Sequence, residues 1–150
     1  RPVEFFPASC TIDGGDVLDT GDTLYGGLSG RTDRKAVDFL ATKTQKKVIA
    51  VPILSGLHLK SSVSYLGGNL LVIHPPAVET SCFKKYEWIE VEDHKAYAAN
   101  CLAIGESVLM PEGYPGLSEQ IEEKGLKVVT LPMSEFEKAD GGVTCLSLII

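Results

Sequence analysis

The alternation of apolar and polar positions predicts short strands and helices that recur in one order along the chain. The first unit begins with two short strands, Val17–Asp19 and Thr23–Leu28. A helix is predicted over Thr32–Gln45, because its apolar residues fall on one side and Thr32 can cap its N-terminus. The apolar strand Lys47–Leu54 follows. The unit therefore has the order strand, strand, helix, strand.

Two later units repeat this order. The second has the strands Ser61–Leu66 and Asn69–His74 around a Gly-Gly turn, a weak helix after Pro76 and the strand Trp88–Val91. The third has the strands Ala99–Ile104 and Ser107–Met110, a helix over Pro115–Lys124 that ends at Gly125, and the strand Leu126–Leu131.

The chain ends with a short helix and one more strand. Ser134 and Glu137 have the spacing of a capping box at the start of that helix. Val143–Ile150 is predicted to be a strand, the first of a unit that the chain does not finish.

The period of the repeat indicates the fold class. The units start at residues 17, 61 and 99, roughly 40 residues apart, which is typical of propellers and arrays. Such repeats stack on their neighbours and rarely close a core in an incomplete set. No linker or low-complexity segment divides the chain. We expect an α/β fold of ββαβ repeats, with residues 1–150 as one region of a longer protein.

Composition and charge narrow the function classes. The hydrophobic fraction of 44% is ordinary for a globular protein, and the net charge of −6 disfavours nucleic-acid binding, which needs basic patches. No apolar run approaches the roughly 20 residues that a membrane span needs. The chain begins Arg1-Pro2-Val3, with no initiating Met and no secretory leader, so we expect that something precedes it. The absence of a leader and of any Cys-x-x-Cys pair favours reduced thiols and a cytoplasmic protein.

We expect no metal site, and we expect neither a serine hydrolase nor a P-loop enzyme. The histidines at 58, 74 and 94 lack helical spacing, and Cys82, His94 and Cys101 match no tight zinc-ligand pattern. No Gly-x-Ser-x-Gly elbow and no phosphate-binding loop occurs, which excludes serine hydrolases and P-loop enzymes.

Three segments could carry chemistry, although each has a simpler explanation. Asp13 and Asp16 flank a Gly-Gly pair just before a strand; the residues there could be only a turn into a hairpin, or could point Asp13 into a site. His58 follows an apolar strand, where a histidine is usually structural but can be a general base. Cys145 could be inert packing, but the Gly-Gly pair before it permits a ligand beside the thiol. A lone Cys with a distant His and carboxylate is the arrangement expected of thiol catalysis.

Taken together, these segments resemble one family. The resemblance rests on IDGGDVL at 12–18, GLSGRT at 27–32, HLKS at 58–61 and MSEFEKADGGVTCLSL at 133–148, in the right order. It is to the dimethylarginine dimethylaminohydrolases of the guanidino-modifying (amidinotransferase) superfamily, whose fold is a five-bladed α/β propeller of the pentein type. About three of those blades would be present, as the C-terminal part of the enzyme.

The resemblance implies roles for six residues. Cys145 would be the nucleophile, His58 the general acid and base, and Asp13 the carboxylate beside the histidine. Arg31 would hold the substrate carboxylate, which suits its planar donor fork. The substrate-binding set would also include two neighbours, Ala139 and Asp140.

One residue separates the relatives. Deiminases and amidinotransferases usually carry His-x-Asp, whereas Lys60 stands two residues after His58 here, as in the dimethylarginine enzymes. The alternative, that Lys60 is only a solvated surface charge, stays open.

The resemblance therefore implies hydrolysis of a methylated arginine to citrulline and an alkylamine through a covalent thiouronium on Cys145, with no metal and no cofactor. The alternatives are an arginine deiminase-like hydrolase and a non-catalytic partner half of the same fold. The expected partners are a small guanidino substrate and the missing blades, or another chain that supplies them; no nucleic acid or membrane is expected. Because the acidic residues that grip the guanidinium normally lie in the missing blades, we expect little turnover by this chain alone.

Overall fold

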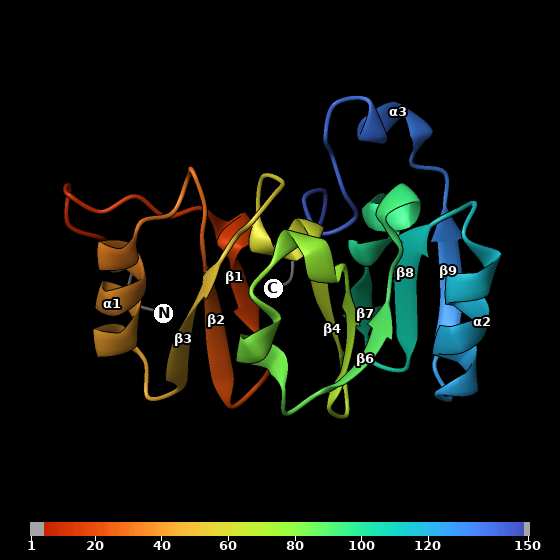
Figure 1. Cartoon of the computed structure of the whole chain (residues 1–150), viewed down its shortest axis with the longest axis horizontal. Helices are drawn as coiled ribbons and strands as arrows, with labels where there is room; N and C mark the ends of the chain where they lie inside the picture. The colour runs from red at the N-terminus through yellow and green to blue at the C-terminus, as the bar shows by residue number, and fades with distance from the viewer. Residues whose placement is uncertain (1–4, 149–150) are drawn as a thin grey trace.

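The computed structural model describes residues 5–148. Three three-stranded sheets lie side by side, and each forms one blade (Figure 1). Their strands are β1 (Val17–Asp19), β2 (Thr23–Leu28) and β3 (Lys47–Pro52); β4 (Val63–Gly67), β5 (Leu70–Ile73) and β6 (Glu87–Glu90); and β7 (Leu102–Ile104), β8 (Ser107–Pro111) and β9 (Lys127–Leu131). In each blade the first two strands pair antiparallel and the last two pair parallel. The predicted repeat is confirmed.

The helix of the first blade begins later than expected. Helix α1 (Arg34–Lys43) is capped by Asp33, whose carboxylate accepts a hydrogen bond from the backbone N–H of Ala36 at 2.8 Å. This bond is the main reason that the pKa of Asp33 lies below its usual range. The prediction that Thr32 is the cap is wrong, because its hydroxyl donates to Asp16 instead.

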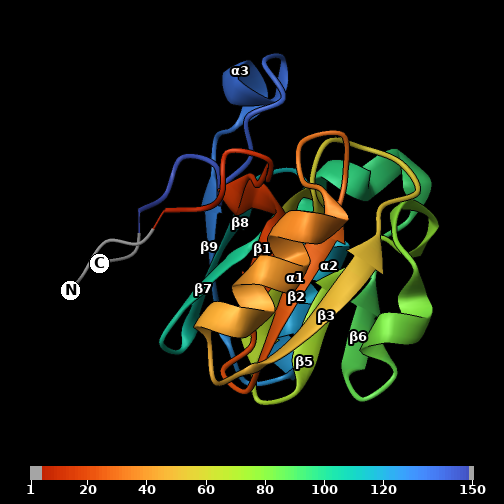
Figure 2. The ribbon, with the colours of Figure 1, turned by 90° about the vertical axis from the view of Figure 1, so that its left-hand side faces the viewer.

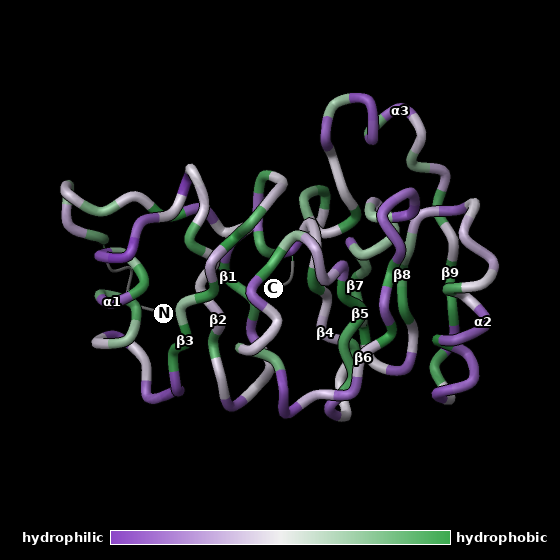
Figure 3. Tube along the Cα trace, viewed as in Figure 1, coloured by the Kyte–Doolittle hydropathy of each residue, from purple (hydrophilic) through white to green (hydrophobic). Residues whose placement is uncertain are grey.

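The second blade has no α-helix between its parallel strands. The connection is made by two short 3₁₀ turns, η3 (Pro75–Ala77) and η4 (Thr80–Phe83). Two adjacent prolines remove backbone donors at this point, which explains why only short turns form. Strand β5, the middle strand of this blade, is hydrophobic and buried along its whole length (Figure 3).

The third blade confirms the predicted helix, α2 (Pro115–Glu123), but the end of the chain differs from the prediction. Helix α3 (Ser134–Glu137) has Met133 as its N-cap with no side-chain cap, so the capping box is absent. The predicted strand Val143–Ile150 is wrong over residues 143–148, because residues 143–146 form a turn and residues 147 and 148 are not in a strand; residues 149 and 150 lie outside the described residues. The local bonds from the N–H groups of Cys145 and Leu146 to the carbonyl of Gly142 satisfy the backbone without a sheet partner.

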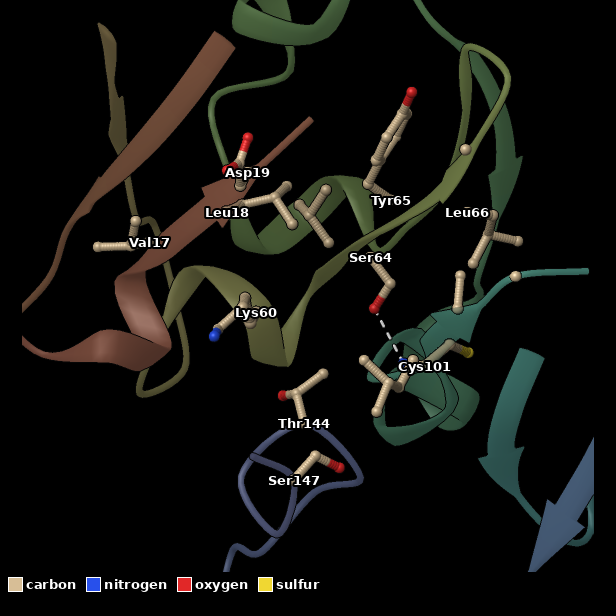
Figure 4. A pocket seen from close by; sticks show the side chains of 15 residues that line it. Val17, Leu18, Asp19, Lys60, Ser64, Tyr65, Leu66, Cys101, Thr144 and Ser147 are labelled. Atoms are coloured by element: carbon tan, nitrogen blue, oxygen red, sulfur yellow. Dashed lines mark hydrogen bonds between the residues drawn. The ribbon is translucent and has the colours of Figure 1, made fainter. Parts of the chain in front are cut away.

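The first strands of the three blades line one cavity. Its volume is about 510 Å³, and its walls come from β1, β4 and β7 together with the segment that follows α3 (Figure 4). Two apolar clusters pack the blades together. One joins the first and second blades and includes Tyr25, Leu71 and Phe83; the other joins the second and third and includes Val72, Met110 and Ile121.

The pairing directions bring several loops to one end of the first blade. Since β1 runs opposite to β2 and β3, the segment entering β1 lies beside the segments leaving β2 and β3. This end, at the top of Figure 1 and visible from the side in Figure 2, carries the 3₁₀ turns η1 (Gly14–Asp16) and η2 (Leu59–Ser61). No helix within residues 5–148 combines the length and the apolar character that crossing a membrane requires.

Candidate active site

His58 lies between two carboxylates. Its Nδ1 is 3.3 Å from Oδ2 of Asp16, and its Nε2 is 3.9 Å from Oδ2 of Asp13. The His58 side chain is only 12% exposed, so the imidazole is largely shielded from water. Each ring nitrogen of His58 therefore faces a carboxylate oxygen.

Asp13 is held by its own turn. Its Oδ1 accepts a hydrogen bond from the N–H of Gly15 at 2.8 Å, which caps η1. Its backbone N–H donates to Oγ1 of Thr32 at 3.0 Å. Oδ2 is left facing His58, with the side chain 37% exposed. The turn predicted for this segment is present, and it directs Oδ2 of Asp13 toward His58.

Asp16 is a functional candidate to which the sequence analysis assigned no role. Its side chain is completely buried, at the point where η1 meets β1. The sequence holds one signal for Asp16: it stands directly before an apolar strand. A carboxylate buried there is costly unless several hydrogen-bond donors surround it. The structure supplies those donors from two loops, the one after β2 and the one after β3.

Arg31 lies in the loop between β2 and α1. Its side chain is exposed, and within residues 5–148 its guanidinium makes no ion pair. The backbone N–H of Arg31 donates to Oγ of Ser29 at 3.0 Å. The loop is thus fixed while the side chain stays available.

The segment with Cys145 is tied to the 3₁₀ turn η5 (Asp93–Ala99) and the residue after it. Tyr97 donates its hydroxyl to the carbonyl of Gly141 at 2.6 Å, and Oδ1 of Asn100 accepts from the N–H of Thr144 at 2.9 Å. Gly142 packs so tightly on the Asn100 side chain that a Cβ there would overlap it. Cys145 itself is exposed.

The other cysteines have different surroundings. Cys101 is buried, and burial raises the pKa of its thiol to about 12. Burial also raises the pKa of Cys82. Because the thiolate is the nucleophile, neither of these two thiols is suited to catalysis.

Lys60 is half-buried and borders the cavity of the three blades together with Thr144 (Figure 4). Burial lowers the pKa of Lys60, while the charges of Cys145, Asp13 and Asp16 act in the opposite direction. Lys60 therefore lies within electrostatic reach of both the thiol and the carboxylates, and it is not a freely solvated surface lysine.

Ala139 and Asp140 occupy a different position. Both are exposed in the turn after α3, where Asp140 has a positive φ of 56°. Asp140 lines a second cavity of about 510 Å³, on the side of the His58 loop that carries Gly56 and Leu57. Asp140 therefore lies near the loop of His58, but it lines a different cavity from Lys60.

The described part of the chain holds no group of three or more side chains arranged to bind a metal ion. The region around His58 offers an imidazole between two carboxylates and, near those carboxylates and the thiol of Cys145, a half-buried ammonium. A thiol and an imidazole are groups that can perform nucleophilic attack with proton transfer.

The chain is similar in sequence to known proteins. No family model matches the sequence. The chain is 36% identical over 149 residues to the N(G),N(G)-dimethylarginine dimethylaminohydrolase of Pseudomonas aeruginosa. The aligned region covers 97% of this chain and 59% of that protein. It is also 36% identical over 143 residues to the enzyme of the same name from Streptomyces coelicolor, which covers 92% of this chain and 54% of that protein. The chain thus spans little more than half the length of these curated relatives.

Solved structures give the same result. The Pseudomonas aeruginosa enzyme, as a cysteine-to-serine variant in complex with citrulline, superposes with a TM-score of 0.87 at 34% identity over 95% of this chain and 57% of that one. The N-terminal domain of a cyanobacterial arginine dihydrolase, bound to its product, superposes with a TM-score of 0.89 at 26% identity over 95% of this chain and 57% of that one. The blades are therefore those of a pentein-type α/β propeller, as expected.

Proposed function

Because the chain is a relative of the dimethylarginine dimethylaminohydrolases in sequence and in structure, we propose that it carries the nucleophile and the acid–base histidine of an enzyme that hydrolyses a methylated arginine to citrulline and an alkylamine. The observation that carries the proposal is the placement of His58 between Asp13 and Asp16, on the blade end that also presents Arg31. The proposed nucleophile is Cys145, and the proposed acid–base residue is His58.

The chemistry explains why a thiol is needed. A guanidinium carbon is stabilised by resonance and is a weak electrophile, so a strong nucleophile is required. Cys145 reacts as the thiolate, which the ammonium of Lys60 and the cationic substrate both favour. Sγ of Cys145 forms a bond to the guanidinium carbon and gives a tetrahedral adduct.

Proton transfer by His58 completes both halves of the reaction. The imidazolium gives its proton to the departing amine as the carbon–nitrogen bond breaks, which leaves a thiouronium on Cys145. The neutral ring then takes a proton from water, and the resulting hydroxide adds to the same carbon. The carbon–sulfur bond breaks as the added hydroxyl loses its proton, which the released amine takes up in solution; citrulline leaves and the thiolate returns. Amine is exchanged for water without a change of oxidation state, so the proposed reaction needs no redox cofactor.

Arg31 is the proposed partner of the substrate α-carboxylate, since its guanidinium is exposed and its loop is fixed. Asp140, beside the loop of His58, and Ala139 complete the proposed substrate-binding set. The acidic residues for the guanidinium would come from further blades, either on a longer form of this polypeptide or on another chain. Residues 1–150 would then be the C-terminal catalytic region. The four free cysteines support the proposal of a reducing, cytoplasmic location.

A second candidate is an arginine-degrading hydrolase that releases ammonia. The similarity to the cyanobacterial arginine dihydrolase favours it. Incubation of the complete protein with asymmetric dimethylarginine, monomethylarginine and arginine separates the two. Citrulline with dimethylamine or methylamine supports our proposal, ammonia from arginine supports the second candidate, and the absence of both citrulline and ammonia with all three substrates contradicts both.

A further inference from the structure

The buried carboxylate of Asp16 receives hydrogen bonds from two loops at once, the loop after β2 and the loop after β3. Oδ1 accepts from the backbone N–H of Leu59 at 2.9 Å. Oδ2 accepts from the hydroxyls of Ser29 and Thr32, each at 2.7 Å, and lies 3.3 Å from Nδ1 of His58. We propose that Asp16 is a positioning residue that fixes the tautomer of His58 and holds the backbones of Asp13 and Arg31. This inference rests on the proposed function.

The direction of each hydrogen bond follows from its neighbours. Oγ of Ser29 already accepts from the N–H of Arg31, and Oγ1 of Thr32 already accepts from the N–H of Asp13. Both hydroxyl protons are therefore free to point at Asp16. The carboxylate meets only donors from these groups, which is the environment that suits its ionised, acceptor-only form.

The tautomer of His58 follows from this arrangement. Because Oδ2 of Asp16 is an acceptor, Nδ1 of His58 carries a proton and donates it. In the neutral ring Nε2 then has its lone pair, on the side where Asp13 lies. Nε2 of the neutral ring can therefore accept a proton from water, while the hydrogen bond from Nδ1 to Asp16 fixes the orientation of the ring.

The same carboxylate reaches two more site residues through single hydroxyl groups. One relay runs from the N–H of Arg31 through Ser29 to Asp16, and the other runs from the N–H of Asp13 through Thr32 to Asp16. Each hydroxyl both accepts and donates, so neither relay leaves a polar atom unpaired. Asp16 thus fixes three functional residues relative to one another.

The packing around Asp16 leaves no room for another arrangement. A Cβ on Gly27 would lie 2.8 Å from Oδ1 of Asp16 and 2.8 Å from Cβ of Leu59. The carboxylate is enclosed by backbone and has no access to water, since the Asp16 side chain is 0% exposed. A buried charge in such a place is retained only with its full set of donors.

Asp16→Asn is the sharpest test, because it keeps the shape and removes the charge. The rigid N–H of Leu59 must still find an acceptor, so the amide oxygen takes the place of Oδ1 and the amide nitrogen takes the place of Oδ2. The hydroxyls of Ser29 and Thr32 can rotate, but His58 must now offer an acceptor at Nδ1. The variant is expected to convert the neutral ring to the form with the proton on Nε2.

The tautomer is read by ¹⁵N NMR of the complete protein without substrate, under conditions where the ring is neutral, with the His58 signals assigned by loss in His58→Gln. In the wild type, the expected signals are those of a protonated Nδ1; in Asp16→Asn, those of a protonated Nε2. The expected fall in kcat is about 100-fold or more, with a smaller change in KM, which is the scale of lost acid–base catalysis.

Asp33→Asn is the matched control, because Asp33 also accepts backbone hydrogen bonds near this end of the blade but does not contact His58. It is expected to leave the tautomer and kcat unchanged. Ser29→Ala, which breaks only the relay to Arg31, is expected to raise KM while the tautomer stays that of the wild type.

An unchanged tautomer in a folded Asp16→Asn protein, or a wild type with the proton on Nε2, overturns the inference. If Asp16→Asn does not fold, the wild-type tautomer and the Ser29→Ala result still decide. The proposed function fails separately, if the wild type releases no citrulline from methylated arginines, and the NMR result does not depend on that outcome.

Discussion

The ring of His58 lies directly on the backbone of Gly15, where a Cβ would stand 2.8 Å from Cγ of the imidazole. No real side chain approaches so closely without displacing its neighbour. The first glycine of the pair differs, because a Cβ on Gly14 meets nothing within 4 Å. The two glycines of one motif therefore have different roles, and only Gly15 makes space for the candidate acid–base residue.

Gly15→Ala is therefore expected to displace His58 and to lower kcat/KM by about 100-fold, the effect of moving a catalytic group by about 1 Å. The overpacking also destabilises the fold by roughly 1–3 kcal/mol. Steady-state kinetics and chemical denaturation measure the two effects. Gly14→Ala is the control, expected to be close to wild type in both. Equal losses in the two variants would show that the glycines serve only the turn.

Cys145 is expected to be the cysteine modified by a haloamidine inactivator. It is exposed, whereas burial raises the pKa of Cys101 to about 12 and also raises that of Cys82. Mass mapping of the labelled peptides identifies the modified thiol, and Cys145→Ser should abolish both labelling and inactivation. Labelling mainly at Cys10, Cys82 or Cys101 would overturn the assignment of the nucleophile.

Lys60→Met is expected to slow alkylation of Cys145 by about threefold, since it removes a partly shielded positive charge that favours the thiolate. The rate of reaction with iodoacetamide, a neutral reagent, measures this effect directly. Lys84→Met removes an exposed lysine that follows η4 in the second blade, and should leave the rate unchanged. Equal rates in the wild type and in Lys60→Met would show that the charge of Lys60 has no effect on the reactivity of Cys145.

Arg31→Ala is expected to weaken kcat/KM by about 2–3 kcal/mol in the complete enzyme, the scale of a lost hydrogen bond between charged groups. The loss should be much smaller for agmatine-like substrates, which have no carboxylate. Arg34→Ala, which removes an exposed arginine paired with Asp38, is the control and should have little effect. A loss that does not depend on the substrate carboxylate would mean that Arg31 is structural.

The 150-residue chain alone is expected to show little or no turnover, while labelling of Cys145 by a small inactivator persists. The reason is that the chain spans 59% of its Pseudomonas aeruginosa relative, and the proposed acidic partners of the guanidinium lie in the remainder. A citrulline assay on the pure chain, beside the complete protein, makes the comparison. Comparable turnover by the two would show that the further blades are dispensable.

Local sequence patterns were enough to determine the blades. Strands such as Thr23–Leu28 and helices such as Pro115–Glu123 arise from apolar periodicity and from glycine or proline at their ends, which act over a few residues. The same patterns failed at Val143–Ile150. That segment is as apolar as a strand, but within residues 143–148 its backbone bonds to itself and to Asn100, a residue more than 40 positions earlier.

The motifs also pointed to Asp13, His58 and Cys145, because thiol chemistry needs those residue types wherever they stand in the sequence. The place of Asp16 could only come from the tertiary structure. Its burial and its four partners depend on how the loops after β2 and β3 fold back beside the start of β1, over separations of up to 43 residues. Electrostatic and hydrogen-bond energies depend on distances in space, and the sequence order of these residues does not contain those distances.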